Sequence, residues 1–219
     1  KISSHLRVVS IRSRQEYEDT VTQFQSYGLT PEMWSYQEML STEPQDNISI
    51  CGWHDPEFKQ YSANTKLMRH PAETGTADVV EIITDVPDEV MSGVDTLLTE
   101  LQYAGPFELE MIFNRKTREY RVIELNPRFW LQHALVSKLT DYSLIRRYLG
   151  EEHLVPVPWK NIEHRYWVNG NRALFYLLCG KWKILHYLRY GFCYPSLLQS
   201  LRFSFHYFRY KRSLRREKS

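Results

Sequence analysis

Oxygen-bearing side chains alternate along two adjacent strand patterns near the middle of the chain. Residues 107–113 (FELEMIF) and 119–125 (EYRVIEL) read as strands, and the polar segment 114–118 (NRKTR) joins them as a hairpin turn. Side chains two apart on a strand share a face, so Glu124 and Asn126 are neighbours and the short connection lets Glu110 lie nearly opposite Glu124. Two carboxylates and an amide oxygen suit Mg²⁺, which typically takes one or two protein carboxylates plus substrate phosphates.

The residues that follow decide between this metal site and an ordinary solvated strand face, which glutamates at alternate positions fit equally well. Pro127 ends the strand at once, and Arg128 adds a planar guanidinium suited to bidentate contact with phosphate or carboxylate. Two carboxylates packed so closely also repel each other unless a cation lies between them. The combination favours the metal site.

The elements around this hairpin indicate a mixed α+β domain. Residues 7–11 read as a short strand, and Ser13 with Glu16 predicts a helix that ends near Gly28. Residues 34–40 read as a short extended stretch, residues 47–53 and 61–69 as strands of a hairpin, and residues 70–78 (HPAETGTAD) as a loop. A strand at 79–83 and an amphipathic helix at 87–103 precede the metal hairpin.

In the run IELNPRFW, preceded by GPFELEMIF, the chain resembles the closing motif of ATP-grasp enzymes, which have an acidic residue on one strand and Glu-x-Asn-Pro-Arg on the next. Other segments follow in that family's order. Residues 36–40 (YQEML) resemble the hinge strand beside the adenine, Lys66 resembles the lysine of the strand that covers the phosphates, and HPAETGTAD resembles the mobile phosphate loop. The resemblance covers roughly residues 1–150 and is closest to the carboxylate–amine ligase group.

The resemblance implies a role for each matching residue. Glu110, Glu124 and Asn126 would bind Mg²⁺, with Mn²⁺ as a second candidate, and the catalytic residues would be Arg128, at the transferring phosphoryl group, and Lys66. The nucleotide would be bound by Lys66 and the hinge, with either Asp46 or Glu43 accepting from the ribose hydroxyls; the residues implied for ATP are Gln37, Glu38, Met39, Leu40, Asp46 and Lys66.

The implied fold is an α+β ATP-grasp fold, an antiparallel sheet with packed helices. Because the chain begins with Lys1 rather than Met and enters the pattern midway, we expect a fragment whose N-terminal lobe is incomplete and which need not be active alone. The implied reaction uses ATP to convert a carboxylate, small or peptide-like, into an acyl phosphate that an amine, or a thiol, then attacks. The alternative is a non-catalytic nucleotide-binding or membrane-associated scaffold.

Charge and aromatic residues concentrate at the C-terminal end. Residues 159–219 hold 13 Lys and Arg against 2 Asp and Glu, whereas the net charge of the whole chain is only +2. We therefore expect two domains, residues 1–150 and a basic, helical appendage at 151–219. Either the appendage packs its aromatics on the core and exposes its charge to solvent, or it attaches to an anionic membrane surface. Nucleic acid is a weaker candidate partner, since no recognition motif is present.

The remaining composition excludes several classes. Three widely spaced cysteines form no CxxC pair, which argues against a zinc ribbon or a disulfide framework and favours a cytoplasmic protein, peripheral at the inner membrane surface if the appendage binds lipid. No HExxH pattern and no Gly-rich P-loop occur in the sequence, so a zincin or Walker-type site is not indicated.

Overall fold

The structure is a computed structural model that describes residues 9–41, 43–70, 76–83, 85–151, 154–156 and 166–202. The chain forms two compact units, Lys1–Thr42 and Glu43–Ser219, which are considered separately below. Among the described residues, no helix combines the length and the apolar character needed to cross a bilayer.

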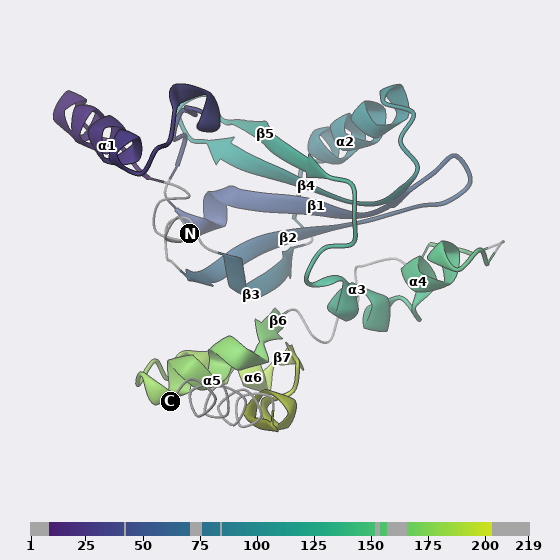
Figure 1. The fold of residues 1–219 in the computed structure, drawn as a ribbon. Coiled ribbons are helices and arrows are strands. Elements are labelled where there is room, and N and C mark those ends of the chain that lie inside the picture. Colours follow the sequence, from purple (N-terminus) through teal and green to yellow (C-terminus); the bar gives the residue numbers. More distant parts are fainter. Residues whose placement is uncertain are drawn as a thin grey trace, which may run out of the picture. The chain divides into compact units, whose positions relative to one another are not determined.

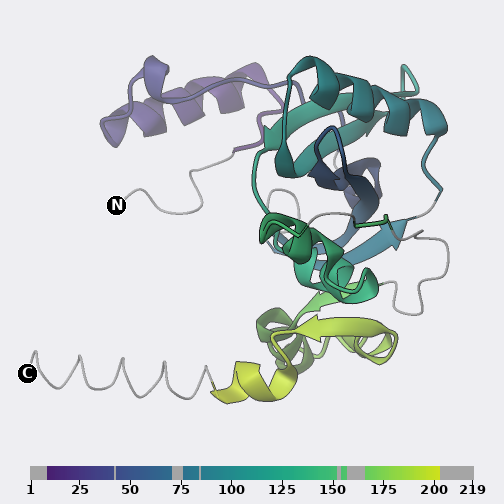
Figure 2. The same ribbon diagram turned by 90° about the vertical axis from the view of Figure 1, so that its right-hand side faces the viewer.

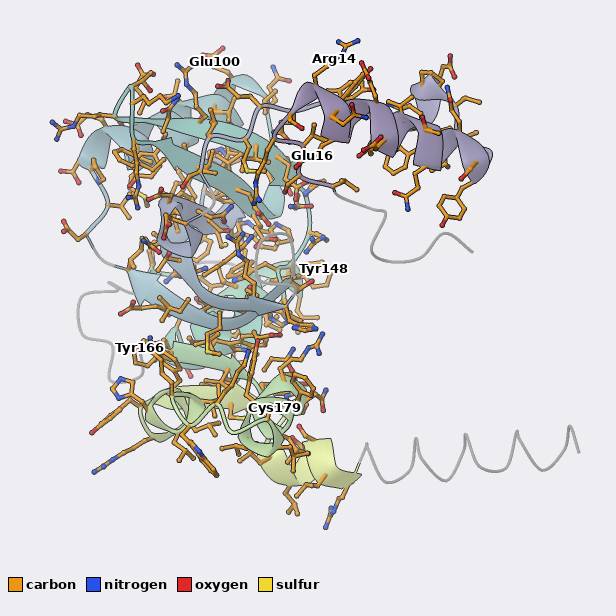
Figure 3. The ribbon with its side chains drawn as sticks, turned by 90° about the vertical axis from the view of Figure 1, so that its left-hand side faces the viewer. Arg14, Glu16, Glu100, Tyr148, Tyr166 and Cys179 are labelled. Atoms are coloured by element: carbon orange, nitrogen blue, oxygen red, sulfur yellow. The ribbon has the colours of Figure 1, made fainter. Side chains whose placement is uncertain are left out.

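The first unit is built around helix α1 (Arg14–Ser26). The hydroxyl of Ser13 accepts a hydrogen bond from the Glu16 backbone N–H at 3.1 Å, and Gly28 follows the helix with φ of +75°, so both predicted ends are confirmed. Arg14 and Glu16 mark the first turn in Figure 3. A short 3₁₀ helix, η2 (Pro31–Met33), comes next.

The predicted strand at 7–11 and the predicted extended stretch at 34–40 do not form strands in the described part of this unit. Residues 34–41 have no regular secondary structure, although Trp34 is extended and its ring packs against Phe24 with centroids 5.0 Å apart. Residues 9–12 are also irregular, and residues 7 and 8 lie outside the described part of the chain. A lone extended segment gains little without a partner strand to satisfy its backbone hydrogen bonds.

The second unit contains a seven-stranded sheet in the order β5-β4-β1-β2-β3-β6-β7. All pairs are antiparallel except β6 with β7, which is parallel. Figure 1 shows the strands from β5 to β3 side by side in this order. The strands span β1 (Asn47–His54), β2 (Lys59–His70), β3 (Thr76–Ile83), β4 (Gly105–Asn114), β5 (Glu119–Asn126), β6 (Tyr166–Asn169) and β7 (Gly191–Tyr194).

Helices cover both faces of this sheet. They are α2 (Asp88–Glu100), α3 (His133–Leu139), α4 (Ser143–Tyr148), α5 (Gly170–Leu178) and α6 (Ile184–Arg189), with a short 3₁₀ turn, η3 (Pro44–Asp46), before β1. The predicted hairpins at 47–69 and 107–125 and the predicted helix at 87–103 are confirmed, with β3 starting three residues earlier than expected. Residues 71–75 of the predicted loop lie outside the described residues.

The two faces are lined by alternate residues of the same strands. Leu98 of α2 packs with Ile50 and Leu109 on one face, whereas Trp130 and Leu144 pack with Cys51 on the other. Figure 2 shows α2 on one side of the strands and α3 and α4 on the other. Because the side chains of a strand alternate, polar residues between the α2-facing ones must point toward the second face.

The C-terminal segment contributes a strand to the central sheet. β6 pairs with β3, and Trp167 is fully buried in the same core as Trp130. Residues 43–219 form one unit, so the only division within the described chain falls near residue 42. The sequence becomes basic and rich in aromatic residues after about residue 156. This change does not mark a structural boundary, because a segment with a basic surface can still contain a buried apolar strand.

Candidate metal and nucleotide site

A β-bulge sets the register of the hairpin that carries the predicted metal ligands. Asn114 pairs with Glu119 at the turn, but the register shifts between Glu110 and Met111, which leaves Ile123 without a cross-strand partner. Without this extra residue, Ile123 would oppose Glu110. With it, Glu124 lies directly opposite Glu110, as predicted.

The same bulge keeps the apolar face of β5 intact. Tyr120 and Leu125, five residues apart, both pack with the α2-side core, which strict alternation would forbid. The extra residue reverses the alternation between them, so Glu124 is free to face the other side with Glu110. The bulge therefore segregates the apolar and acidic side chains of this hairpin.

Lys66 of β2 reaches this acidic face. Its Nζ lies 2.6 Å from Glu110 Oε2, and both side chains are more than four-fifths buried. The contact joins residues 44 positions apart and crosses β1, which lies between β2 and β4. The structure thus brings the predicted phosphate lysine and a predicted metal ligand together.

The end of β5 holds three further predicted residues in a chain of contacts. Asn126 Nδ2 donates to Glu124 Oε1 at 2.8 Å, and Arg128 Nη2 donates to Asn126 Oδ1 at 3.4 Å. The Arg128 backbone N–H also donates to the Asn126 carbonyl at 2.9 Å, which folds the chain back directly after Pro127. The Asn126 amide is thus held between the Glu124 carboxylate, to which its nitrogen donates, and the Arg128 guanidinium, from which its oxygen accepts.

Glu108 is a member of this group that the sequence interpretation missed. It pairs with Asn126 across the β4–β5 ladder, is only 8% exposed, and has Arg128 Nη1 3.7 Å from its Oε2. Burial and the neighbouring Glu110 carboxylate raise its pKa, while Lys66 and Arg128 lower it. The sequence could have indicated Glu108, because it lies two residues before Glu110 on a strand and therefore shares its face. The apolar residues between and beside them are Phe107, Leu109 and Met111.

Arg69 is a second residue that the sequence did not indicate. Lys66 and Arg69 are three residues apart, which on a regular strand would place them on opposite faces, but the β2–β3 register is irregular around Met68 between them. Burial lowers the pKa of the Arg69 guanidinium and the Glu110 carboxylate opposes that shift. Among the described residues, nothing hydrogen-bonds to the buried Nε of Arg69. A second cation thus lies near the acidic group.

The residues predicted at the adenine and at the ribose belong to different units of the chain. Gln37, Glu38 and Met39 are exposed in the first unit, and Leu40 is half-buried there. Asp46 lies in the second unit, where Arg115 binds its carboxylate through two hydrogen bonds of 2.6 and 2.9 Å. These positions remain predictions for nucleotide contacts.

The cluster combines carboxylates with basic side chains. It therefore differs from a site in which protein groups alone surround a metal ion. Within the described ranges, no three His, Cys, Asp or Glu side chains are close enough to hold a metal by themselves. Glu108, Glu110 and Glu124 nevertheless share one face with Lys66 and Arg128. Carboxylate and amide oxygens beside fixed cations suit a metal ion that is shared with the phosphates of a ligand.

Comparison with known proteins identifies the domain around this hairpin. Residues 69–149 match the model of the family described as carbamoyl-phosphate synthase L chain, ATP binding domain. The N-terminal section of the carbamoyl phosphate synthase large chain from Methanopyrus kandleri is 28% identical over 99 residues, which cover 45% of this chain and 16% of that protein. The chain contains an ATP-grasp superfamily domain.

Among solved structures, carboxylases align with this chain at lower sequence identity than the Methanopyrus kandleri protein. Pyruvate carboxylase from Rhizobium etli aligns at a TM-score of 0.46 with 14% identity, covering 62% of this chain and 13% of that chain. Biotin carboxylase from Campylobacter jejuni aligns at a TM-score of 0.42 with 12% identity, covering 65% and 32%. The residues of the family match span β4, β5 and the Arg128 turn, so the ATP-grasp domain includes the acidic cluster.

Proposed function

We propose that the ATP-grasp domain binds ATP with Mg²⁺ at the β4–β5 face and serves an ATP-dependent ligase that activates a carboxylate. The observation that carries the proposal is the convergence of Glu108, Glu110, Glu124 and Asn126 with Lys66 and Arg128 on one side of the sheet. The match to an ATP-binding domain family supports the choice of nucleotide.

The residues present fit a divalent cation. Glu108 is buried, and its pKa is raised because burial and Glu110 both disfavour its ionised form. A metal ion beside it would stabilise the carboxylate and relieve the repulsion from Glu110 and Glu124. We assign Glu108, Glu124 and Asn126 as the protein ligands, and Glu110 as the residue that holds Lys66 in place through their 2.6 Å contact.

Lys66 and Arg128 supply the fixed positive charge. Phosphoryl transfer places charge on the non-bridging oxygens of the transferred group, and cations fixed beforehand stabilise that charge without reorganisation. Mg²⁺ would neutralise phosphate charge when bound. Lys66 reaches the face from β2, and Arg128 reaches it from the turn after β5, where Asn126 orients its guanidinium.

The proposed reaction has two steps. An oxygen of the substrate carboxylate attacks the γ-phosphorus, the bond to the ADP oxygen breaks, and an acyl phosphate forms. The amine nitrogen then attacks the acyl carbon, phosphate leaves, and the nitrogen loses a proton, which gives an amide. In this scheme the protein positions the reactants and stabilises charge, and no protein side chain forms a covalent intermediate.

The first experiment is calorimetric titration of the chain with ATP, with Mg²⁺ and with EDTA in its place. The double variant Glu124→Ala/Asn126→Ala should lose more than about tenfold in Mg²⁺-dependent affinity, because two of the three assigned oxygen ligands are removed. The matched control is Glu119→Ala/Arg121→Ala, which removes an exposed ion pair from the other end of the same strand and should bind normally.

Two outcomes would count against the proposal. If the double variant binds as tightly as the control, the site lies elsewhere. If MgATP binds at the cluster but a phosphate-release assay detects no turnover with any carboxylate–amine pair, a non-catalytic nucleotide-binding scaffold becomes the better interpretation.

A further inference from the structure

A second surface, unrelated to the acidic cluster, lies at the turn between α5 and α6. Three apolar side chains in this short segment are turned to solvent: Leu178 is 80% exposed, Trp182 is 66% exposed and Leu185 is 50% exposed. Cys179, labelled in Figure 3, marks the turn. We call residues 178–185 the α5–α6 turn. Exposing a tryptophan and two leucines together is costly in water unless another apolar phase covers them.

The α5–α6 turn is rigidly built. Gly180 has φ of +70° and its N–H donates to the Leu177 carbonyl, while the Lys181 N–H donates to the Tyr176 carbonyl at 2.9 Å. This is the Schellman pattern that ends a helix in a fixed direction. Three residues after Lys181, Ile184 is fully buried and anchors the start of α6. The backbone therefore presents Trp182 in a defined position.

Positive charge flanks the exposed tryptophan on both sides. Lys181 Nζ lies 5.3 Å from the centre of the Tyr176 ring, and Lys183 Nζ lies 5.9 Å from the centre of the Tyr187 ring. Both tyrosine rings are nearly buried, so they hold the two ammonium groups beside the turn. Lysines in such positions can contact an anionic surface while Trp182 and the leucines enter it.

The charge of the surrounding segment has a single sign. Residues 166–202 contain five Lys and Arg and no Asp or Glu, and residues 203–219 add six Lys and Arg against one Glu. A protein partner would require complementary acidic and apolar groups at matched positions. An anionic bilayer offers a negative surface beside an apolar interior, and tryptophan prefers the boundary between the two.

We propose that the α5–α6 turn is a peripheral docking site for anionic lipid bilayers. Trp182, Leu178 and Leu185 enter the headgroup region, and Lys181 and Lys183 contact lipid phosphates. The attachment is shallow and reversible, because the inserted area is a single turn and the attraction to anionic lipid is screened by salt. It does not depend on the proposed ATP site, whose residues lie mainly on β4 and β5.

Flotation of the full chain with vesicles tests this proposal. Vesicles of phosphatidylcholine with phosphatidylglycerol should carry the protein upward at low salt, and phosphatidylcholine alone should not. Lys181→Glu/Lys183→Glu should lower the affinity for anionic vesicles by about tenfold or more, because two attractive charges near the surface become repulsive. Trp182→Ala should also reduce it. The matched controls are Lys116→Glu and Leu149→Ser, which alter an exposed charge and an exposed leucine elsewhere.

A label at the turn reports insertion directly. Cys179 is exposed, Cys51 is buried and Cys193 is half-buried, so a Cys193→Ser variant can be labelled at Cys179 with an environment-sensitive maleimide dye. Dye emission should rise with anionic vesicles and not with neutral ones. Equal binding by the turn variants and the controls, or co-migration with RNA homopolymer in place of anionic vesicles, would overturn the proposal.

Discussion

At the scale of single residues, the burial of the Glu108 carboxylate distinguishes this strand face from an ordinary solvated acidic face. Surface glutamates that alternate on a strand remain solvated, and their charge costs little. Glu108 instead lies against the core beside Glu110, and its pKa is raised chiefly by burial. Such a group is costly in isolation and becomes favourable when a cation binds.

The pH dependence of MgATP binding should report Glu108. Its raised pKa means that the carboxyl keeps its proton to a higher pH than an ordinary glutamate, and a metal must displace that proton. We expect affinity, measured by calorimetry across a pH series, to rise as pH increases through this pKa and then level off. Glu108→Gln should bind more weakly and without this rise.

Glu110→Gln provides the matched test of the assignment. Glu110 is the largest electrostatic contributor to the raised pKa of Glu108, so its neutralisation should move the rise in affinity to lower pH. If the affinity rises at the same pH in Glu110→Gln as in the unaltered protein, and still rises in Glu108→Gln, a group other than Glu108 titrates.

At the scale of elements, a buried ion pair connects the β1–β2 turn to α4. Arg147 Nε lies 2.9 Å from Asp55 Oδ2, across 92 residues of sequence, and both side chains are at most 15% exposed. Burial alone would raise the pKa of Asp55. Hydrogen bonds from Arg147, Trp53 and the backbone N–H groups of Phe58 and Glu57 outweigh burial and lower that pKa to about 2.

This pair predicts acid sensitivity of folding. Because the folded-state pKa of Asp55 is depressed, its contribution to stability is present above the ordinary aspartate pKa and is lost as pH falls from about 4 toward 2. The contribution should be about 2 kcal/mol. Urea unfolding of Arg147→Met should give a lower free energy of unfolding at neutral pH than the unaltered protein. That free energy should also depend less on pH between about 4 and 2.

Arg146→Met is the control for the ion pair. Arg146 pairs with Glu151 on the surface, where both side chains are well exposed, so its removal should change stability by less than about 1 kcal/mol. A similar loss in both arginine variants would mean that lost packing of α4, rather than the Asp55 pair, explains the effect.

At the scale of the whole molecule, the basic C-terminal segment is part of the central fold. Trp167 of β6 is 1% exposed and packs in the core that includes Trp130 and Val80. Trp182, fifteen residues on, is exposed. One aromatic-rich segment thus contributes both a buried strand and a surface turn.

The two tryptophans provide a direct comparison. Trp167→Ala should destabilise the protein by about 3–5 kcal/mol, because it leaves a cavity in the sheet core. Trp182→Ala should change stability by less than about 1 kcal/mol, because its side chain loses few contacts. Thermal or urea unfolding of both variants checks this, and a small effect of Trp167→Ala would favour an independent appendage after all.

The sequence by itself determined most of the local elements and suggested the chemistry that we propose. Ser13 and Gly28 delimit a helix, alternation defines the strands, and a short polar turn requires that residues 107–126 form a hairpin with Glu110 near Glu124. These features depend on neighbours close in the chain, and periodicity and turn residues encode them directly. The ATP-grasp resemblance rested on the same local run, and the family match to residues 69–149 includes it.

Only the tertiary structure decided which residues meet across strands. The contact of Lys66 with Glu110 depends on the strand order β4-β1-β2. Glu124 lies directly opposite Glu110 because of a β-bulge that the local sequence pattern does not predict. The burial of Glu108, and the entry of β6 into the sheet beside β3, follow from which faces the helices cover. Strand order, register and burial arise from packing between segments that are distant in the sequence. The free energy that favours one arrangement is a sum over many residues, so no single local pattern predicts it.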